Sequence, residues 1–226
     1  MKQSFKQFLT EIMSYKEPDL GTLPDYGGRE VEKAAKDYRE RNPHIEHLTV
    51  GCHAAVSHSK DPMHTDRVWR TANAKDAGTV WLKYIVEHPE LHNNPFVPRV
   101  LEIEDGMIVT YQVEKLTPFL EPDIIRNKHL IQSKLKQYFN DPISTEWTPR
   151  ATLVRTISEA IATGDCSKIK DRQLTQVLQA IYQIKVRATT RTVEDLADSN
   201  MMWRMTRVGP QLVITDPLWS DYEKNI

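Results

Sequence analysis

The strongest constraint on the fold is a change of pattern along the chain. Between residues 47 and 113 the apolar side chains come in short runs rich in β-branched residues, separated by turn residues, which is typical of β-strands. The runs cover residues 47–50, 54–58, 67–72, 97–103 and 107–113. One helical pattern, over residues 76–88, interrupts them. Asp105-Gly106 between the last two runs predicts a hairpin turn.

After residue 120 the pattern becomes helical. Three helices are expected, over residues 122–139, 149–163 and 171–188. The last has apolar residues close to a 3.6-residue period, and Asp171 is placed to cap its first turn. Two further strands, over residues 201–207 and 211–215, are expected to form a hairpin near the end of the chain.

This order predicts an α+β fold with two lobes: a small antiparallel-sheet N-lobe containing one helix, and a reduced helical C-lobe. We expect the N-lobe at residues 46–116 and the C-lobe at residues 117–226. Residues 1–45 are expected to form an N-terminal helical extension, in which residues 29–41 make a charged, solvated helix ended by Pro43.

Composition excludes several classes of function. With 226 residues and a net charge of −1, the chain lacks the excess of Lys and Arg expected of a dedicated nucleic-acid or membrane-surface binder. No apolar run approaches the roughly 18 to 20 residues that span a bilayer, and the first residues do not resemble a secretory signal. Cys52 and Cys166 stand in no metal-binding or redox spacing, so a reducing cytoplasm is expected.

The residues with the clearest chemical meaning lie near the end of the chain. Asp195 precedes Asn200 by five residues, and Asp216 follows Asn200 by sixteen, at the end of the return strand of the expected hairpin. A hairpin of this length brings Asn200 and Asp216 to the same end. Their oxygens are hard ligands that suit Mg²⁺, and Asp195 could orient the proton of an attacking hydroxyl. The plainer alternative is that these residues only cap turns.

The sequence DLADSNMMWR followed by LVITDPLW resembles the catalytic and metal-binding loops of the protein-kinase-like fold. It is more closely similar to the loops of small bacteriophage serine/threonine protein kinases, including the podovirus early-gene kinase. The resemblance implies a catalytic role for Asp195 and Mg²⁺ binding by Asn200 and Asp216. It covers roughly residues 47–220, although specific motif residues are confined to the end of that range.

Upstream segments follow in the order that this resemblance implies. Residues 50–58 (VGCHAAVSH) are similar to a reduced nucleotide-binding loop between two strands, and residues 67–71 (RVWRT) to the strand that carries the phosphate-binding cation, here Arg70. Residues 107–116 (MIVTYQVEKL) are similar to the strand that enters the hinge between the lobes. The resemblance therefore implies a nucleotide site formed by Gly51, His53, Ala54, Arg70, Glu114 and Leu116.

We therefore expect a phage-encoded kinase that uses ATP and Mg²⁺ to phosphorylate a Ser or Thr hydroxyl of a host bacterial protein in the host cytoplasm. Two alternatives stay open: a pseudokinase that binds and inhibits a host protein, and a small-molecule phosphotransferase of the aminoglycoside-kinase type. The last would need an acidic acceptor cleft, for which Glu146, Glu159 and Asp165 are available. The fold alone does not separate these functions.

Several positions depart from the kinase pattern. Arg70 stands where the family has lysine, and a planar guanidinium does not replace a compact ammonium group directly. Its acidic partner could be Asp76 at the start of the following helix or Glu87 near the end of that helix. The expected phosphate loop keeps one glycine, Gly51, and no His or Arg directly precedes Asp195.

Two weaker patterns favour ordinary structure. His88 and His92 lack the glutamate of a zincin motif, and Pro89 beside them indicates a helix end and turn. The segment Leu9-Thr10-Glu11 is similar to the cleavage site of capsid-targeting peptides of large phages, which implies packaging into the virion, but three residues favour an ordinary first helix. The oligomeric state leaves no signature in the sequence.

Overall fold

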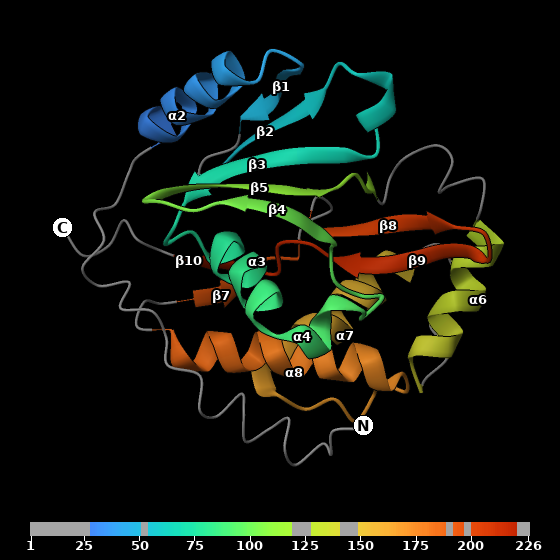
Figure 1. Ribbon diagram of the computed structural model, residues 1–226. Helices are drawn as coiled ribbons and strands as arrows, with labels where there is room; N and C mark the ends of the chain where they lie inside the picture. Colours follow the sequence, from blue (N-terminus) through green and yellow to red (C-terminus); the bar gives the residue numbers. More distant parts are fainter. Residues whose placement is uncertain are drawn as a thin grey trace.

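The computed structural model describes residues 28–50, 54–118, 128–140, 149–188, 192–196 and 200–220. The upper part of the molecule in Figure 1 is a five-stranded antiparallel sheet with the strand order β1-β2-β3-β5-β4. The strands are β1 (Ile45–Val50), β2 (Ala54–Ser59), β3 (Arg67–Asn73), β4 (Val100–Glu104) and β5 (Ile108–Glu114). A 3₁₀ turn, η2 (Pro62–His64), joins β2 to β3.

Helix α3 (Ala77–Glu87) lies between β3 and β4 in the sequence, as the helical pattern predicts. Asp76 caps it by accepting the Thr79 N–H at 3.0 Å. The connection from β3 is a tight turn, because the Asn73 side chain accepts the Lys75 N–H at 2.9 Å. Beyond α3 the chain makes one further helical turn, α4 (Pro89–His92), where the sequence predicts a helix end and turn.

Helix α2 (Gly28–Arg41) covers the outer part of the sheet and contacts β1, β2 and β3 (Figure 1). Its buried residues are Val31 and Ala35, which form a small cluster with Ala55 of β2. The remaining positions of the helix are mostly exposed, as its mixed charges predict.

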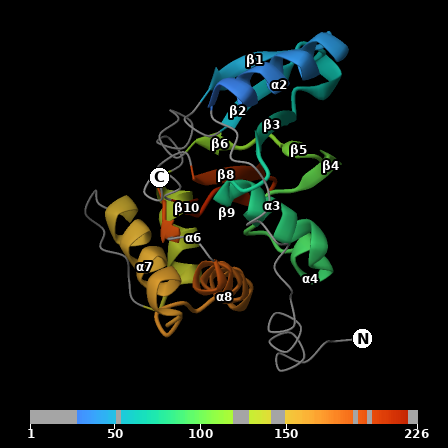
Figure 2. The ribbon, with the colours of Figure 1, turned by 90° about the vertical axis from the view of Figure 1, so that its left-hand side faces the viewer.

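In the part of the chain that the structure describes, the lower lobe contains three helices and two small sheets. The helices α6 (Lys128–Tyr138), α7 (Pro149–Thr163) and α8 (Arg172–Arg187) lie together below the five-stranded sheet (Figure 2). The strands are β6 (Thr117–Pro118), β7 (Thr192–Glu194), β8 (Met201–Thr206), β9 (Gly209–Ile214) and β10 (Leu218–Ser220). No helix in the described ranges is long and apolar enough to cross a membrane.

One hydrophobic core runs through both parts. It includes Trp81 of α3 and Tyr111 of β5 above, and Trp203 of β8 and Leu178 of α8 below, all almost completely buried. Fully burying a large apolar side chain stabilises the fold by about 1.5 to 3 kcal/mol, so the continuous core holds the parts together. The predicted α+β fold with two lobes is confirmed.

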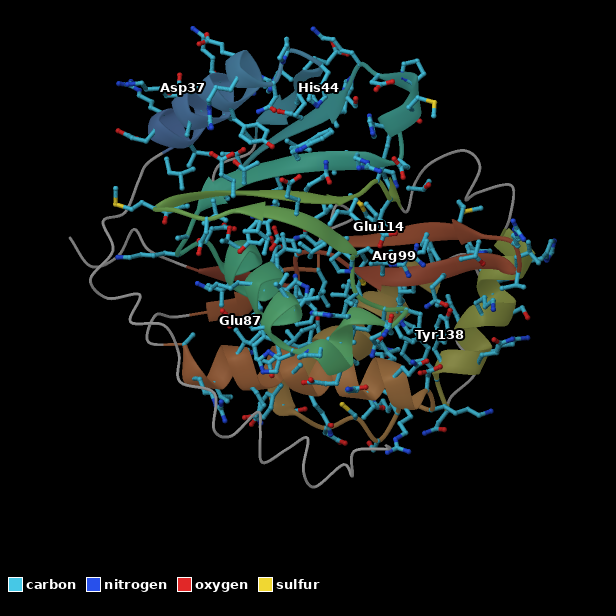
Figure 3. All side chains as sticks on the ribbon, viewed as in Figure 1. Asp37, His44, Glu87, Arg99, Glu114 and Tyr138 are labelled. Carbon is cyan, nitrogen blue, oxygen red and sulfur yellow. The ribbon has the colours of Figure 1, made fainter. Side chains whose placement is uncertain are left out.

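A buried ion pair also joins the lobes. Arg204 of β8 donates to both carboxylate oxygens of Glu114 at the end of β5, and to the backbone carbonyls of Pro95 and Val97. These contacts explain why β4 begins at Val100 rather than at residue 97, since the Val97 carbonyl accepts a side-chain donor. Figure 3 shows Glu114 beside Arg99, whose N–H donates to the Glu114 carboxylate.

Candidate active site

The chain segments that carry Asp195, Asn200 and Asp216 meet at the base of the β8–β9 hairpin. Asp195 follows β7, and its N–H donates to the Pro217 carbonyl at 2.9 Å. The Asn200 side-chain amide donates to the Asp195 carbonyl at 2.9 Å, and the Thr215 N–H donates to the Asn200 carbonyl. The structure therefore brings together the chain segments of the three residues for which the resemblance implies catalytic and metal-binding roles.

Arg70 reaches this place from β3 in the upper lobe. Its Nη2 lies 2.7 Å from Oδ2 of Asp76 and 3.0 Å from Oδ2 of Asp216. Its Nη1 donates to the Thr79 hydroxyl at 3.1 Å. One guanidinium group thus connects β3, the first turn of α3 and the loop after β9.

The acidic partner of Arg70 in α3 is Asp76, at the start of the helix. Of the two residues that the sequence offered, Glu87 is exposed and lies at the opposite end of α3 (Figure 3). The tight turn after β3 keeps Asp76 near its own strand, and the Asp76 N–H donates to the Asn73 carbonyl at 3.0 Å. The pair therefore forms through a local connection of the chain.

The site concentrates charge in a largely buried place. The side chains of Arg70 and Asp76 are 14% and 13% exposed. Burial, with smaller effects of the Asp76 and Asp195 carboxylates, raises the pKa of Asp216 to about 6 against the opposing effect of Arg70. Burial by itself would lower the pKa of Arg70, but Asp76 and Asp216 outweigh it and raise that pKa. Arg70 is therefore a permanent cation.

Gly78, in the first turn of α3, lies directly against Asp216. A Cβ atom at this position would stand 2.1 Å from Oδ1 and 2.5 Å from Cγ of Asp216. The absence of a side chain therefore admits the Asp216 carboxylate. Sequence reasoning missed this contact, as it missed the role of Thr79. The available signal was a glycine in the first turn of a helix in a chain that has eight glycines in all.

The residues present fit a magnesium ion. Oδ1 of Asp216 is buried and has no hydrogen-bond partner among the described residues, which leaves an acceptor for a cation. The Asn200 backbone carbonyl accepts the Thr215 N–H, which places Asn200 next to the loop that carries Asp216. Within the described ranges no group of three or more His, Cys, Asp or Glu side chains could hold a metal. The side-chain oxygens of Asn200 and Asp216 are hard ligands of the kind that suits Mg²⁺, which commonly takes its remaining ligands from phosphates and water.

The expected nucleotide-binding residues are only partly described. Gly51 and His53 lie outside the described residues, whereas Ala54 opens β2 and pairs with Ala72 of β3. Leu116 is half-buried in the short connection between β5 and β6.

Glu114 has a contact that the sequence did not predict. Its carboxylate binds Arg204, and its N–H donates to the Arg99 carbonyl at 3.0 Å. The N–H of the next residue, Lys115, donates to the Asp66 carbonyl at 2.7 Å. The Glu114 carboxylate and the N–H groups of Glu114 and Lys115, in the connection between the lobes, therefore all form hydrogen bonds within the protein.

Comparison with known proteins adds little at the level of sequence. No protein-family model matches the chain, and no curated protein matches it. Among solved structures, the chain is similar to an aminoglycoside phosphotransferase from Streptomyces rimosus, with a TM-score of 0.41 and 14% identity. That match covers 83% of this chain and 77% of the other. The fold assignment therefore rests on the order of elements and strand pairing above.

Proposed function

We propose that this protein is a phosphotransferase that uses ATP and Mg²⁺. The observation that carries the proposal is the meeting of Arg70 with Asp216, within a group that also contains Asp195 and Asn200. Three separate parts of the chain, at residue 70, residues 195–200 and residue 216, supply one cation, two carboxylates and an amide to one place.

Each residue has a role that suits phosphoryl transfer, which depends mainly on positioning and on neutralising charge. Asp195 would accept or orient the proton of the attacking hydroxyl. Asn200 and Asp216 would hold Mg²⁺, which when bound neutralises the phosphate oxygens. Arg70 would place a fixed positive charge beside the phosphates while its contact with Asp76 holds it in position.

The acceptor we propose is a Ser or Thr hydroxyl of a host bacterial protein, in the host cytoplasm. The support for this finer assignment is the resemblance of the loops around Asp195 and Asp216 to those of small bacteriophage kinases. A phage origin is part of the same proposal, whereas packaging into the virion is only weakly supported by three residues and is not proposed. Leu9-Thr10-Glu11, the segment that bears on packaging, lies outside the described residues.

A pseudokinase that binds a host protein is the second candidate, and one observation favours it. The protein itself engages both terminal nitrogens of Arg70, through Asp76, Asp216 and Thr79. With these contacts, the Arg70 guanidinium would stabilise the fold around the site even if the protein catalysed no reaction. In that case the fold would serve recognition rather than catalysis.

A small-molecule acceptor has weaker support. Glu159 and Asp165 do line one cavity of about 210 Å³, together with Lys168. However, Glu159 is paired with Lys168 at 2.8 Å, and the cavity is formed by α7 and the loop before α8. None of its lining residues belongs to the segments that carry Asp195, Asn200 or Asp216. Glu146 lies outside the described residues.

The proposal is tested by incubating the protein with γ-labelled ATP and Mg²⁺, in parallel with bacterial lysate or with aminoglycosides as acceptors. The control is Asp195→Ala. Label on protein bands that disappears in the control supports a protein kinase, and label on the small molecule supports the third function. Folded protein that transfers no label above the control would overturn the enzymatic proposal in favour of a pseudokinase.

A further inference from the structure

The contact between Gly78 and Asp216 has no counterpart in the resemblance that suggested the site. Helix α3 has buried positions along much of its length, and Trp81 also donates its indole N–H to the Ile214 carbonyl at 3.3 Å. Ile214 lies two residues before Asp216. Helix α3 of the upper lobe is therefore attached at two places to the chain segment that carries the candidate metal ligand.

Glycine is otherwise a poor choice at this position. Glycine in a helix is less favourable than alanine because it loses more backbone freedom on folding. Gly78 does not have the positive φ that would require glycine, since the described glycines with positive φ are Gly164 and Gly209. Its backbone gives no reason for glycine, so the reason lies in the space that its missing side chain leaves.

That space is filled by the Asp216 carboxylate. The ideal Cβ position at Gly78 stands within 2.6 Å of both carboxylate oxygens. A methyl group there is incompatible with this position of the carboxylate. Because the obstruction is the end of a side chain rather than backbone, the fold can accept the methyl group if Asp216 turns away.

We propose that Gly78 is a positioning residue: it makes a slot on the first turn of α3 that holds the Asp216 carboxylate where it meets Arg70 and can bind a divalent cation with a nucleotide. This inference rests on the proposed function. It also predicts that α3 and the loop after β9 keep a fixed relationship. Arg70 and Gly78 contact Asp216 in that loop, and Trp81 donates to Ile214 at the end of β9.

The first measurement is a double-mutant cycle of stability, which does not depend on activity. The four proteins are the wild type, Gly78→Ala, Asp216→Ala and the double variant, compared by the urea midpoint of unfolding. We expect Gly78→Ala to lower the midpoint in the wild-type background. We expect it to leave the midpoint unchanged or raise it in the Asp216→Ala background, where the obstruction is gone and the better helix former is introduced.

The second measurement is the affinity for Mn²⁺ in the presence of ATP, followed by the electron paramagnetic resonance signal of free Mn²⁺. Gly78→Ala is expected to weaken binding by about tenfold or more, the usual size of an effect on a residue that orients a metal ligand. The matched control is Gly106→Ala in the β4–β5 turn, where a Cβ atom would meet its nearest neighbour at 3.2 Å. That variant should bind Mn²⁺ as the wild type does.

The outcomes separate the inference from the function on which it rests. The proposed fit of the Asp216 carboxylate against Gly78 is contradicted if Gly78→Ala shifts the urea midpoint equally in the wild-type and Asp216→Ala backgrounds. The positioning role is wrong if the two residues are coupled in stability but Gly78→Ala binds Mn²⁺ with ATP as tightly as the wild type. If the wild type binds neither Mn²⁺ nor ATP, the proposed function is contradicted, and the positioning role of Gly78 is contradicted with it.

Discussion

The Arg70 guanidinium contacts the Asp76 carboxylate at 2.7 Å across the turn that joins β3 to α3. In the kinase pattern that this chain resembles, a lysine would occupy the position of Arg70. The structure indicates why arginine serves here, since the planar group reaches Asp76, Asp216 and Thr79 at once. The arginine is therefore an integral part of the site.

Replacing Arg70 by lysine should damage this site. A single ammonium group cannot reproduce the forked contacts to two carboxylates and a hydroxyl. We therefore expect Arg70→Lys to lower the free energy of unfolding by about 1.5 to 3 kcal/mol, the range for hydrogen bonds to charged groups. Nucleotide affinity should fall as well. Urea unfolding and ATP binding measure the two effects. Arg67→Lys, which affects a pair with the adjacent Asp66, is the control. A lysine variant equal to the wild type in both respects would contradict this account.

The two candidate partners of Arg70 should differ sharply when neutralised. Asp76→Asn keeps an oxygen that can cap α3 but removes the charge beside the buried guanidinium. We expect Asp76→Asn to lower the free energy of unfolding by about 1 to 3 kcal/mol. This is less than the loss of a whole buried ion pair, because the Asp216 carboxylate still contacts Arg70. Glu87→Gln, at the exposed end of the helix, should change the free energy of unfolding by no more than about 1 kcal/mol, the range for solvent-exposed charge interactions. Equal effects of the two substitutions on the urea midpoint would be evidence against the assignment of Asp76.

The ion pair between Arg204 and Glu114 should be important for the attachment of the two lobes. Both side chains are 13% exposed, so Glu114→Gln leaves a buried guanidinium without its counter-charge. We expect a loss of about 3 to 5 kcal/mol in the free energy of unfolding. The matched control is Glu104→Gln, because Glu104 pairs with Arg41 at the surface and should contribute less than about 1 kcal/mol. Similar losses in the two variants would show that Glu114 does not join the lobes as described.

The pH dependence of Cys166 alkylation should show that the thiol is partly buried. Burial raises the pKa of the Cys166 thiol to about 11, and Asp165 adds to the shift. At pH 8 the reactive thiolate should therefore be roughly 100-fold scarcer than for an unperturbed thiol. In a Cys52→Ser chain, alkylation should be slow at pH 8 and rise by about tenfold per pH unit towards the pKa. Urea should abolish the protection, and a plateau reached below pH 9 in the folded protein would show that the thiol is not shielded.

The sequence was most informative where local pattern determines structure. The five strands of the upper sheet and helix α3 follow from β-branched runs and one helical period, and the register of β8 and β9 fixes the neighbourhood of Asn200 and Asp216. The strands β6, β7 and β10 have two or three residues each, so no periodic pattern marks them. They form because distant parts of the chain meet.

The details of the site were not predictable in the same way. The choice between Asp76 and Glu87 depended on the geometry of the turn after Asn73, which spacing alone does not give. The contact of Gly78 with Asp216 and the pair between Arg204 and Glu114 join residues far apart in the sequence. Such contacts follow from how the lobes pack. The glycine in the first turn of α3 is a local signal of a close approach, but the sequence does not identify the side chain that fills the space.

The central claim is that one site binds ATP together with Mg²⁺, with separate roles for the carboxylates of Asp195 and Asp216. Isothermal titration calorimetry of ATP, with and without Mg²⁺, tests it most directly in the wild type, Asp216→Ala and Asp195→Ala. The account predicts that Mg²⁺ tightens ATP binding in the wild type and in Asp195→Ala, and that this gain is lost in Asp216→Ala. Absence of ATP binding in the folded wild type, or an equal gain from Mg²⁺ in all three proteins, would contradict it.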